Sequence, residues 1–124
     1  MLRLVVARST LALLLILTGS AVAAAAELTF DIRIEHGSVA DTMRLMRVQQ
    51  GDGVMLRWTS DRALVVHLHG YDIEKHIAAG GVTEMKFTAY ATGRFPIEIH
   101  GQGAGAGDAA RDGAPLAIIE VYPR

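Results

Sequence analysis

The sequence of 124 residues contains no cysteine. Disulfide bonds are therefore excluded, although small exported domains often depend on them. Thiolate chemistry, whether nucleophilic or metal-ligating, is excluded for the same reason. Basic residues are not in excess either, because the formal net charge is −1. Nucleic acids and anionic membranes attract basic surfaces, so neither is an expected partner.

Catalytic signatures are also missing. Beyond residue 26 the only serines are Ser38 and Ser60, and neither lies in the strand-to-helix turn of a serine nucleophile. The glycines of residues 101–107 do not lie between a strand and a helix, as a phosphate-binding loop requires. We therefore expect a protein that is not an enzyme.

Residues 1–26 have the three-part pattern of a secretory signal peptide. Arg3 and Arg8 supply the positive start, residues 11–17 form an apolar run, and three alanines end the segment before Glu27. The apolar run is short for a membrane span, which needs about 20 apolar residues. We expect export to the periplasm with cleavage of residues 1–26, no membrane attachment afterwards, and one mature domain over residues 27–124.

Alternation of apolar and polar residues dominates the mature segment. This period of two is typical of strands that pack one face on a core and expose the other. It is clearest in residues 28–34, 54–59, 85–90 and 94–99, and we expect weaker strands in residues 43–49, 63–69 and 116–122. About seven short strands separated by turn residues predict an all-β sandwich.

Three local features carry further expectations. Ile73 and Ile77 would share one face of a helical turn over residues 72–77. Pro96 has no amide hydrogen, which predicts an edge or a bulge for its strand. Residues 101–113 are rich in glycine and alanine and predict a surface loop.

The chemistry of this chain is concentrated in its histidines. His67 and His69 are two residues apart, so an extended strand projects both from one face. Two neutral imidazoles at this spacing suit copper or zinc, and His100 is the leading candidate for a third ligand. A pair of solvent-facing histidines with no metal is the alternative interpretation of the same pattern.

Residues 27–124 resemble the cupredoxin family over nearly their whole length. Four stretches carry the resemblance: Val48–Trp58 with its glycine–aspartate turn, Ser60–Asp61 followed by His67–Asp72, Gly93–His100, and the closing strand Ile119–Tyr122. The resemblance implies a Greek-key β-sandwich of cupredoxin type, preceded here by the signal peptide. It also implies a copper site whose first histidine matches His67, with His69 as an alternative.

The family's electron carriers complete the site with a cysteine, a second histidine and usually a methionine before the last strand. Here the cysteine position falls on Ile99 or His100, and residues 101–115 contain no histidine and no methionine. Without a thiolate, blue-copper electron transfer is excluded. We expect a non-catalytic domain that binds copper, or zinc, through His67 and His69, with His100 as the candidate third ligand, for periplasmic metal handling.

Strand alternation leaves the role of His100 open. His100 shares a face with Glu98, toward solvent, so we expect it to reach the histidine pair only if its strand ends at Ile99. Glu98 has three interpretations: an exposed carboxylate, which is the favoured one, a metal ligand, or an acceptor that orients an imidazole. The alternative function is a metal-free interaction module that meets a periplasmic partner protein through residues 70–81.

Overall fold

A computed structural model describes residues 19–21, 23–100 and 114–124. Most of the expected signal peptide and the expected loop at 101–113 lie outside these residues. The described chain forms eight strands: β1 (Glu27–Ile34), β2 (Leu45–Gln49), β3 (Gly53–Ser60), β4 (Leu64–Leu68), β5 (Ile73–Ile77), β6 (Thr83–Thr88), β7 (Gly93–His100) and β8 (Ala117–Tyr122). The all-β prediction is confirmed, with one strand more than expected.

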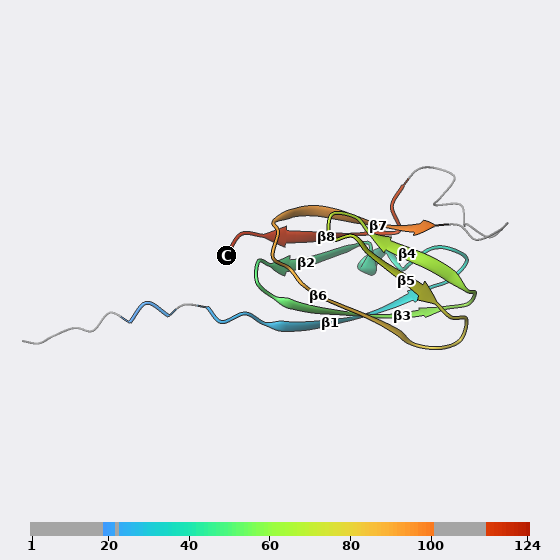
Figure 1. Ribbon diagram of the computed structural model, residues 1–124, viewed down its shortest axis with the longest axis horizontal. Helices are drawn as coiled ribbons and strands as arrows, with labels where there is room; N and C mark the ends of the chain where they lie inside the picture. Colours follow the sequence, from blue (N-terminus) through green and yellow to red (C-terminus); the bar gives the residue numbers. More distant parts are fainter. Residues whose placement is uncertain (1–18, 22, 101–113) are drawn as a thin grey trace, which may run out of the picture.

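The strands form two sheets that pack face to face (Figure 1). One sheet has the order β1-β3-β6 and the other the order β2-β8-β7-β4-β5. The pairs β1–β3 and β2–β8 are parallel, while all other neighbouring strands are antiparallel. Alternation of side chains predicted the strands but contains no information on strand direction.

The core lies between the two sheets. Alternate residues of β3 are buried there, and Leu56 and Trp58 have no exposed surface. The opposite sheet contributes Val66, Leu68 and Ile97, each also fully buried. Burying one such side chain contributes about 1.5–3 kcal/mol relative to leaving it exposed. The fold is therefore held by packing and strand pairing, as the absence of cysteine requires.

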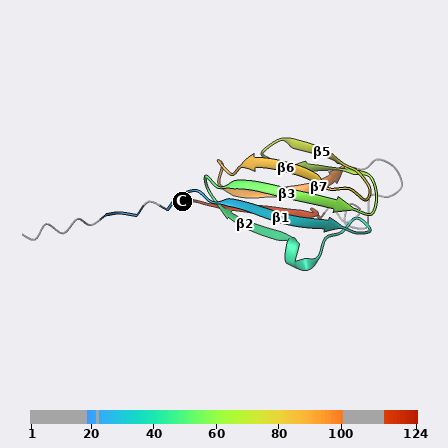
Figure 2. The same cartoon turned by 90° about the horizontal axis from the view of Figure 1, so that it is seen from below.

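The helical turn predicted over residues 72–77 is wrong, because this segment is strand β5. Ile73 and Ile77 are four residues apart, and this even spacing puts them on one face of a strand as well as of a helix. Antiparallel pairing with β4 places Ile73 opposite Leu68 and Ile77 opposite Leu64. Among the described residues the helical element is a single 3-10 turn, Asp41–Met43, beside β2 (Figure 2), and no helix could cross a membrane.

The edge position predicted from Pro96 is also wrong, since β7 lies between β8 and β4 in the middle of its sheet. The ladder between β7 and β4 covers Ile97–His100 and stops before Pro96. Pro96, the residue without an amide hydrogen, therefore lies just beyond the end of the ladder between β7 and β4. The carbonyl of Pro96 still accepts a hydrogen bond from the amide of His69, at 3.0 Å.

A buried carboxylate fixes the end of the sandwich at which the β2–β3 turn lies. Asp52 is 3% exposed and accepts hydrogen bonds from the amides of Ala26 (3.0 Å) and Gln49 (2.9 Å). The Arg124 guanidinium donates to the same carboxylate at 2.5 Å. These donors, led by the Ala26 amide, hold the pKa of Asp52 below its usual range. Ala26, the last residue of the expected signal peptide, thus contacts the domain.

Candidate metal centre

The register of two antiparallel strands brings His67 and His100 onto one face. In the β4–β7 pair, His67 lies opposite Glu98 and Val65 lies opposite His100. Their neighbours Val66 and Leu68 point into the core, so His67, Glu98 and His100 point away from it. The histidines therefore share the outer face of the five-stranded sheet.

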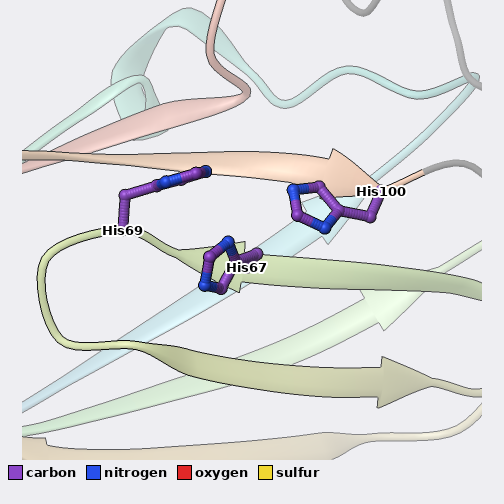
Figure 3. A group of neighbouring side chains, drawn as sticks. All are labelled: His67, His69 and His100. Carbon is purple, nitrogen blue, oxygen red and sulfur yellow. The ribbon is translucent and has the colours of Figure 1, made fainter.

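His69 completes the group from the turn after β4. The amide of His69 bonds to Pro96, which holds this residue beside β7. The ring centroid of His67 lies 4.2 Å from that of His69 and 4.9 Å from that of His100, and the other two centroids are 5.9 Å apart. One potential ligand atom from each ring lies within 4.8 Å of the others, and Figure 3 shows the rings gathered between the two strands.

The structure brings together all three histidines that the sequence singled out. Alternation correctly places His100 on the same face as Glu98. We expected His100 to reach His67 and His69 only if its strand ended at Ile99. This condition was wrong, because β7 continues through His100 and His100 still lies beside the other two histidines. The reason is that His67 also faces outward, so no change of direction at Ile99 is needed.

Three carboxylates surround the histidine cluster, defined here as His67, His69 and His100. Glu98 Oε2 lies 2.9 Å from His69 Nε2 and 3.9 Å from His100 Nε2. Glu74 on β5 lies 3.8 Å from His100 Nδ1, and Asp72 lies 3.4 Å from His67 Nε2.

Glu74 was not among the residues predicted from the sequence. Glu74 lies directly opposite His67 in the β4–β5 pair. Alternation along residues 73–77 would have found it if this segment had been recognised as a strand, because Glu74 would then alternate with Ile73.

The turn between β4 and β5 is tightly constrained. Gly70 has φ +85° and Asp72 has φ +55°, the left-handed region in which aspartate is tolerated better than most residues. A Cβ on Gly70 would lie 2.4 Å from the Phe95 ring. The turn is therefore packed against the aromatic side chains below it. This packing fixes the positions of His69 and Asp72 in the turn.

Tyr71 anchors the same turn. Its ring packs against Phe87, Tyr90 and Phe95, with centroid separations of 4.7–5.0 Å. Its hydroxyl donates to the carbonyl of Ala91 at 2.8 Å and accepts from the Ala91 amide at 3.2 Å. Burial raises the pKa of Tyr71, so the phenol is neutral at ordinary pH and acts as a structural anchor.

One nitrogen of the histidine cluster is left without a partner. His67 Nδ1 is buried and has no hydrogen-bond partner among the described residues. Trp58 Nε1 shares this property, but Trp58 lies in the apolar core. His67 Nδ1 instead belongs to a ring with two further imidazoles beside it. A buried nitrogen without a partner costs free energy. Coordination of a metal ion is one way in which this nitrogen can gain a partner.

The donor set fits a borderline transition-metal ion. Imidazole nitrogen suits copper and zinc, which are bound at about 2.0–2.1 Å. Tetrahedral ligands at this distance lie roughly 3.3 Å from one another. The ligand atoms lie within 4.8 Å of one another, so the side chains need to approach by at most about 1.5 Å. Rotation of surface side chains can supply this, and the carboxylates offset part of the ion's charge.

No family model matches this sequence, and no curated protein matches it. Solved structures do share its fold. A chain of a heme-copper terminal oxidase dimer superimposes with a TM-score of 0.60 at 19% identity, over 76% of this chain and 64% of that one. The periplasmic domain of subunit II of cytochrome oxidase from Bradyrhizobium japonicum gives 0.56 at 16% identity, over 77% and 84%.

A copper-binding protein in its apo form gives a TM-score of 0.56 at 10% identity, over 77% of this chain and 88% of that one. This chain spans less than two thirds of the oxidase chain described first, and 31% of a multi-copper oxidase from Pseudomonas thermotolerans. At such identities the similarity establishes the shared fold and nothing about the site.

The fold is that of a cupredoxin-like domain, and this expectation is confirmed. Neighbours in this fold include both enzymes and a copper-binding protein, so the fold alone does not decide between catalysis and binding. On the outer face of its five-stranded sheet, the chain carries three histidines whose placement is compatible with one metal ion.

Proposed function

We propose that this protein is an exported, non-catalytic domain that binds copper(II) through His67, His69 and His100 and serves metal handling in the periplasm. The observation that supports this most strongly is the convergence of three imidazoles from β4, its following turn and β7. The unpaired nitrogen of His67 adds to it, because a metal ion supplies the partner that this atom lacks.

Copper is the preferred ion because imidazole sites bind divalent metals with affinities that peak at copper(II). Zinc is the competitor, since it accepts the same ligands. Electron transfer of the blue-copper kind is not proposed, because the sequence has no thiolate to offer. A site on the outer face of a sheet suits exchange of a metal ion with a partner protein in the periplasm.

Export is part of the same proposal. Residues 1–26 act as a cleaved signal peptide, and residues 27–124 form the mature cupredoxin-like domain. The mass of the protein recovered from the periplasm gives the cleavage position directly. A mature chain found attached to the membrane, or retained in the cytoplasm at full length, contradicts this part.

The test is calorimetric titration of the purified domain with copper(II) and, separately, with zinc(II). We expect about one copper ion per chain. We also expect loss of this binding in the double variant His67→Ala with His69→Ala. His36→Ala is the matched control, because the His36 side chain is exposed and contacts Asp61 outside the histidine cluster. If the domain binds neither copper nor zinc at micromolar concentration, the proposal is contradicted.

A metal-free interaction module is the second candidate. Each imidazole of the histidine cluster already faces a carboxylate at 2.9–3.9 Å, so the group does not depend on an ion for favourable contacts. The contact surface would then be residues 70–81, as the sequence analysis expected. The same titrations separate the candidates, because this module takes up neither metal.

A further inference from the structure

Glu98 holds the central position in the histidine cluster. It lies directly opposite His67 in the β4–β7 register and two residues before His100 on the same face. Its Oε2 atom is 2.9 Å from His69 Nε2 and 3.9 Å from His100 Nε2. One carboxylate oxygen therefore lies near nitrogens of two of the three proposed ligands.

We propose that Glu98 is a fourth metal ligand, so that the centre has three imidazole nitrogens and one carboxylate oxygen. This inference rests on the proposed function. In the metal-free protein the carboxylate contacts His69, and on metal binding the oxygen bonds the ion instead. Among the described residues, the ion-pair contacts of Glu98 are with His69 and His100, two of the proposed ligands.

The two other carboxylates are less well placed. Glu74 approaches only His100, at 3.8 Å, and it extends from the edge strand β5. Asp72 approaches only His67, and its side chain is 99% exposed. Asp72 faces Nε2 of His67, on the other side of the ring from the unpaired Nδ1. It therefore suits an acceptor that orients the ring, not a ligand.

A carboxylate ligand has a consequence for the ion that is bound. Soft ligands such as thiolate and thioether select copper(I), whereas imidazole and carboxylate suit harder, divalent ions. The carboxylate also lowers the net charge of a bound divalent ion by one. The proposed site therefore binds copper(II) more tightly than copper(I).

Pulsed electron paramagnetic resonance of copper(II) in the full mature domain tests this, using protein made with glutamate labelled with ¹³C at the side-chain carboxylate. We expect a ¹³C coupling in the unaltered protein that is lost in Glu98→Gln and kept in the matched variant Glu74→Gln. We also expect copper affinity to fall at least about tenfold in Glu98→Gln and by less in Glu74→Gln, because a lost ligand costs more than a lost outer-shell partner.

The outcomes are distinguishable. Copper uptake without a glutamate ¹³C coupling in the unaltered protein overturns the role of Glu98 and leaves the proposed function standing. So does a coupling that persists in Glu98→Gln or disappears in Glu74→Gln. If the unaltered protein takes up no copper, the proposed function fails together with the inference. The measurement on the unaltered protein needs no variant to fold.

Discussion

The two faces of strand β4 differ in what holds their side chains. On the inner face, Val66 and Leu68 have no exposed surface and pack in the core. On the outer face, His67 lies among imidazoles and carboxylates that come from other strands. Residues that alternate along five positions of one strand thus serve two purposes, stability on one side and chemistry on the other.

The difference teaches where each property is encoded. The inner face needs only apolar side chains at alternate positions, and many combinations of similar volume fill such a space. The outer face needs particular atoms at particular distances, and these depend on the register of β4 against β7. A shift of that register by one residue would turn every side chain of one strand to the opposite face.

The largest expected effect comes from the inner face. Leu68→Ala should lower the free energy of unfolding by about 2–5 kcal/mol, because it removes buried methyl groups and leaves a cavity. His67→Ala, one residue earlier, should change the same quantity by about 1 kcal/mol or less, because that side chain lies outside the core. Urea unfolding of the metal-free variants gives both values.

The order of the two variants reverses for the stabilisation that copper provides. Copper should stabilise Leu68→Ala by as much as it stabilises the unaltered protein, since the histidine cluster is intact. It should stabilise His67→Ala much less. Equal losses of stability in the two metal-free variants would show that the faces are not independent.

Asp52 sharpens the comparison, because it is a polar side chain that serves stability. Its carboxylate is buried and accepts hydrogen bonds from Gln49 and Arg124, and also from Ala26 in the full-length chain. Asp52→Asn should therefore lower the free energy of unfolding at neutral pH by about 2 kcal/mol, the range of hydrogen bonds to a charged group. Thermal or urea unfolding across a range of pH measures it.

The pH dependence follows from the lowered pKa of Asp52 in the folded full-length chain, in which the Ala26 amide is the leading donor. The stabilisation is fully present above the unfolded pKa, near 3.8, and is lost as the pH falls through the lower, folded pKa. The difference between the unaltered protein and Asp52→Asn should be constant above about pH 5 and narrow below about pH 4. Asp41→Asn, at an exposed carboxylate, is the control and should produce no comparable difference.

The fold could be predicted from the sequence because alternation determines which residues face the core. The strands around Leu56 and Ile97 were recognised in this way, and both residues are fully buried. Strand β5 was missed because the spacing of Ile73 and Ile77 fits a helix and a strand equally. The central place of β7 was missed because Pro96 lies just past its ladder with β4, which no local pattern reveals.

The candidate site could be predicted only in part. The spacing of His67 and His69 identified two of its members, because both lie in one continuous segment. The meeting with His100, and the position of Glu98 between the rings, depend on how β4 and β7 pair. Pairing register is set by the whole core and by turn geometry, so the sequence left the third histidine open.

The smallest expected effect is a difference between two glycine variants, and it tests the turn between β4 and β5. Gly70→Ala and Gly80→Ala both place a side chain at positive φ, +85° and +74°, which costs about 1–2 kcal/mol. Only Gly70 is also crowded, because its added Cβ would meet the Phe95 ring, whereas nothing lies within 4 Å at Gly80. The free energy of unfolding of Gly70→Ala should therefore be lower than that of Gly80→Ala by about 1 kcal/mol. Equal values would mean that Phe95 moves freely, and that the core does not hold the turn that carries His69.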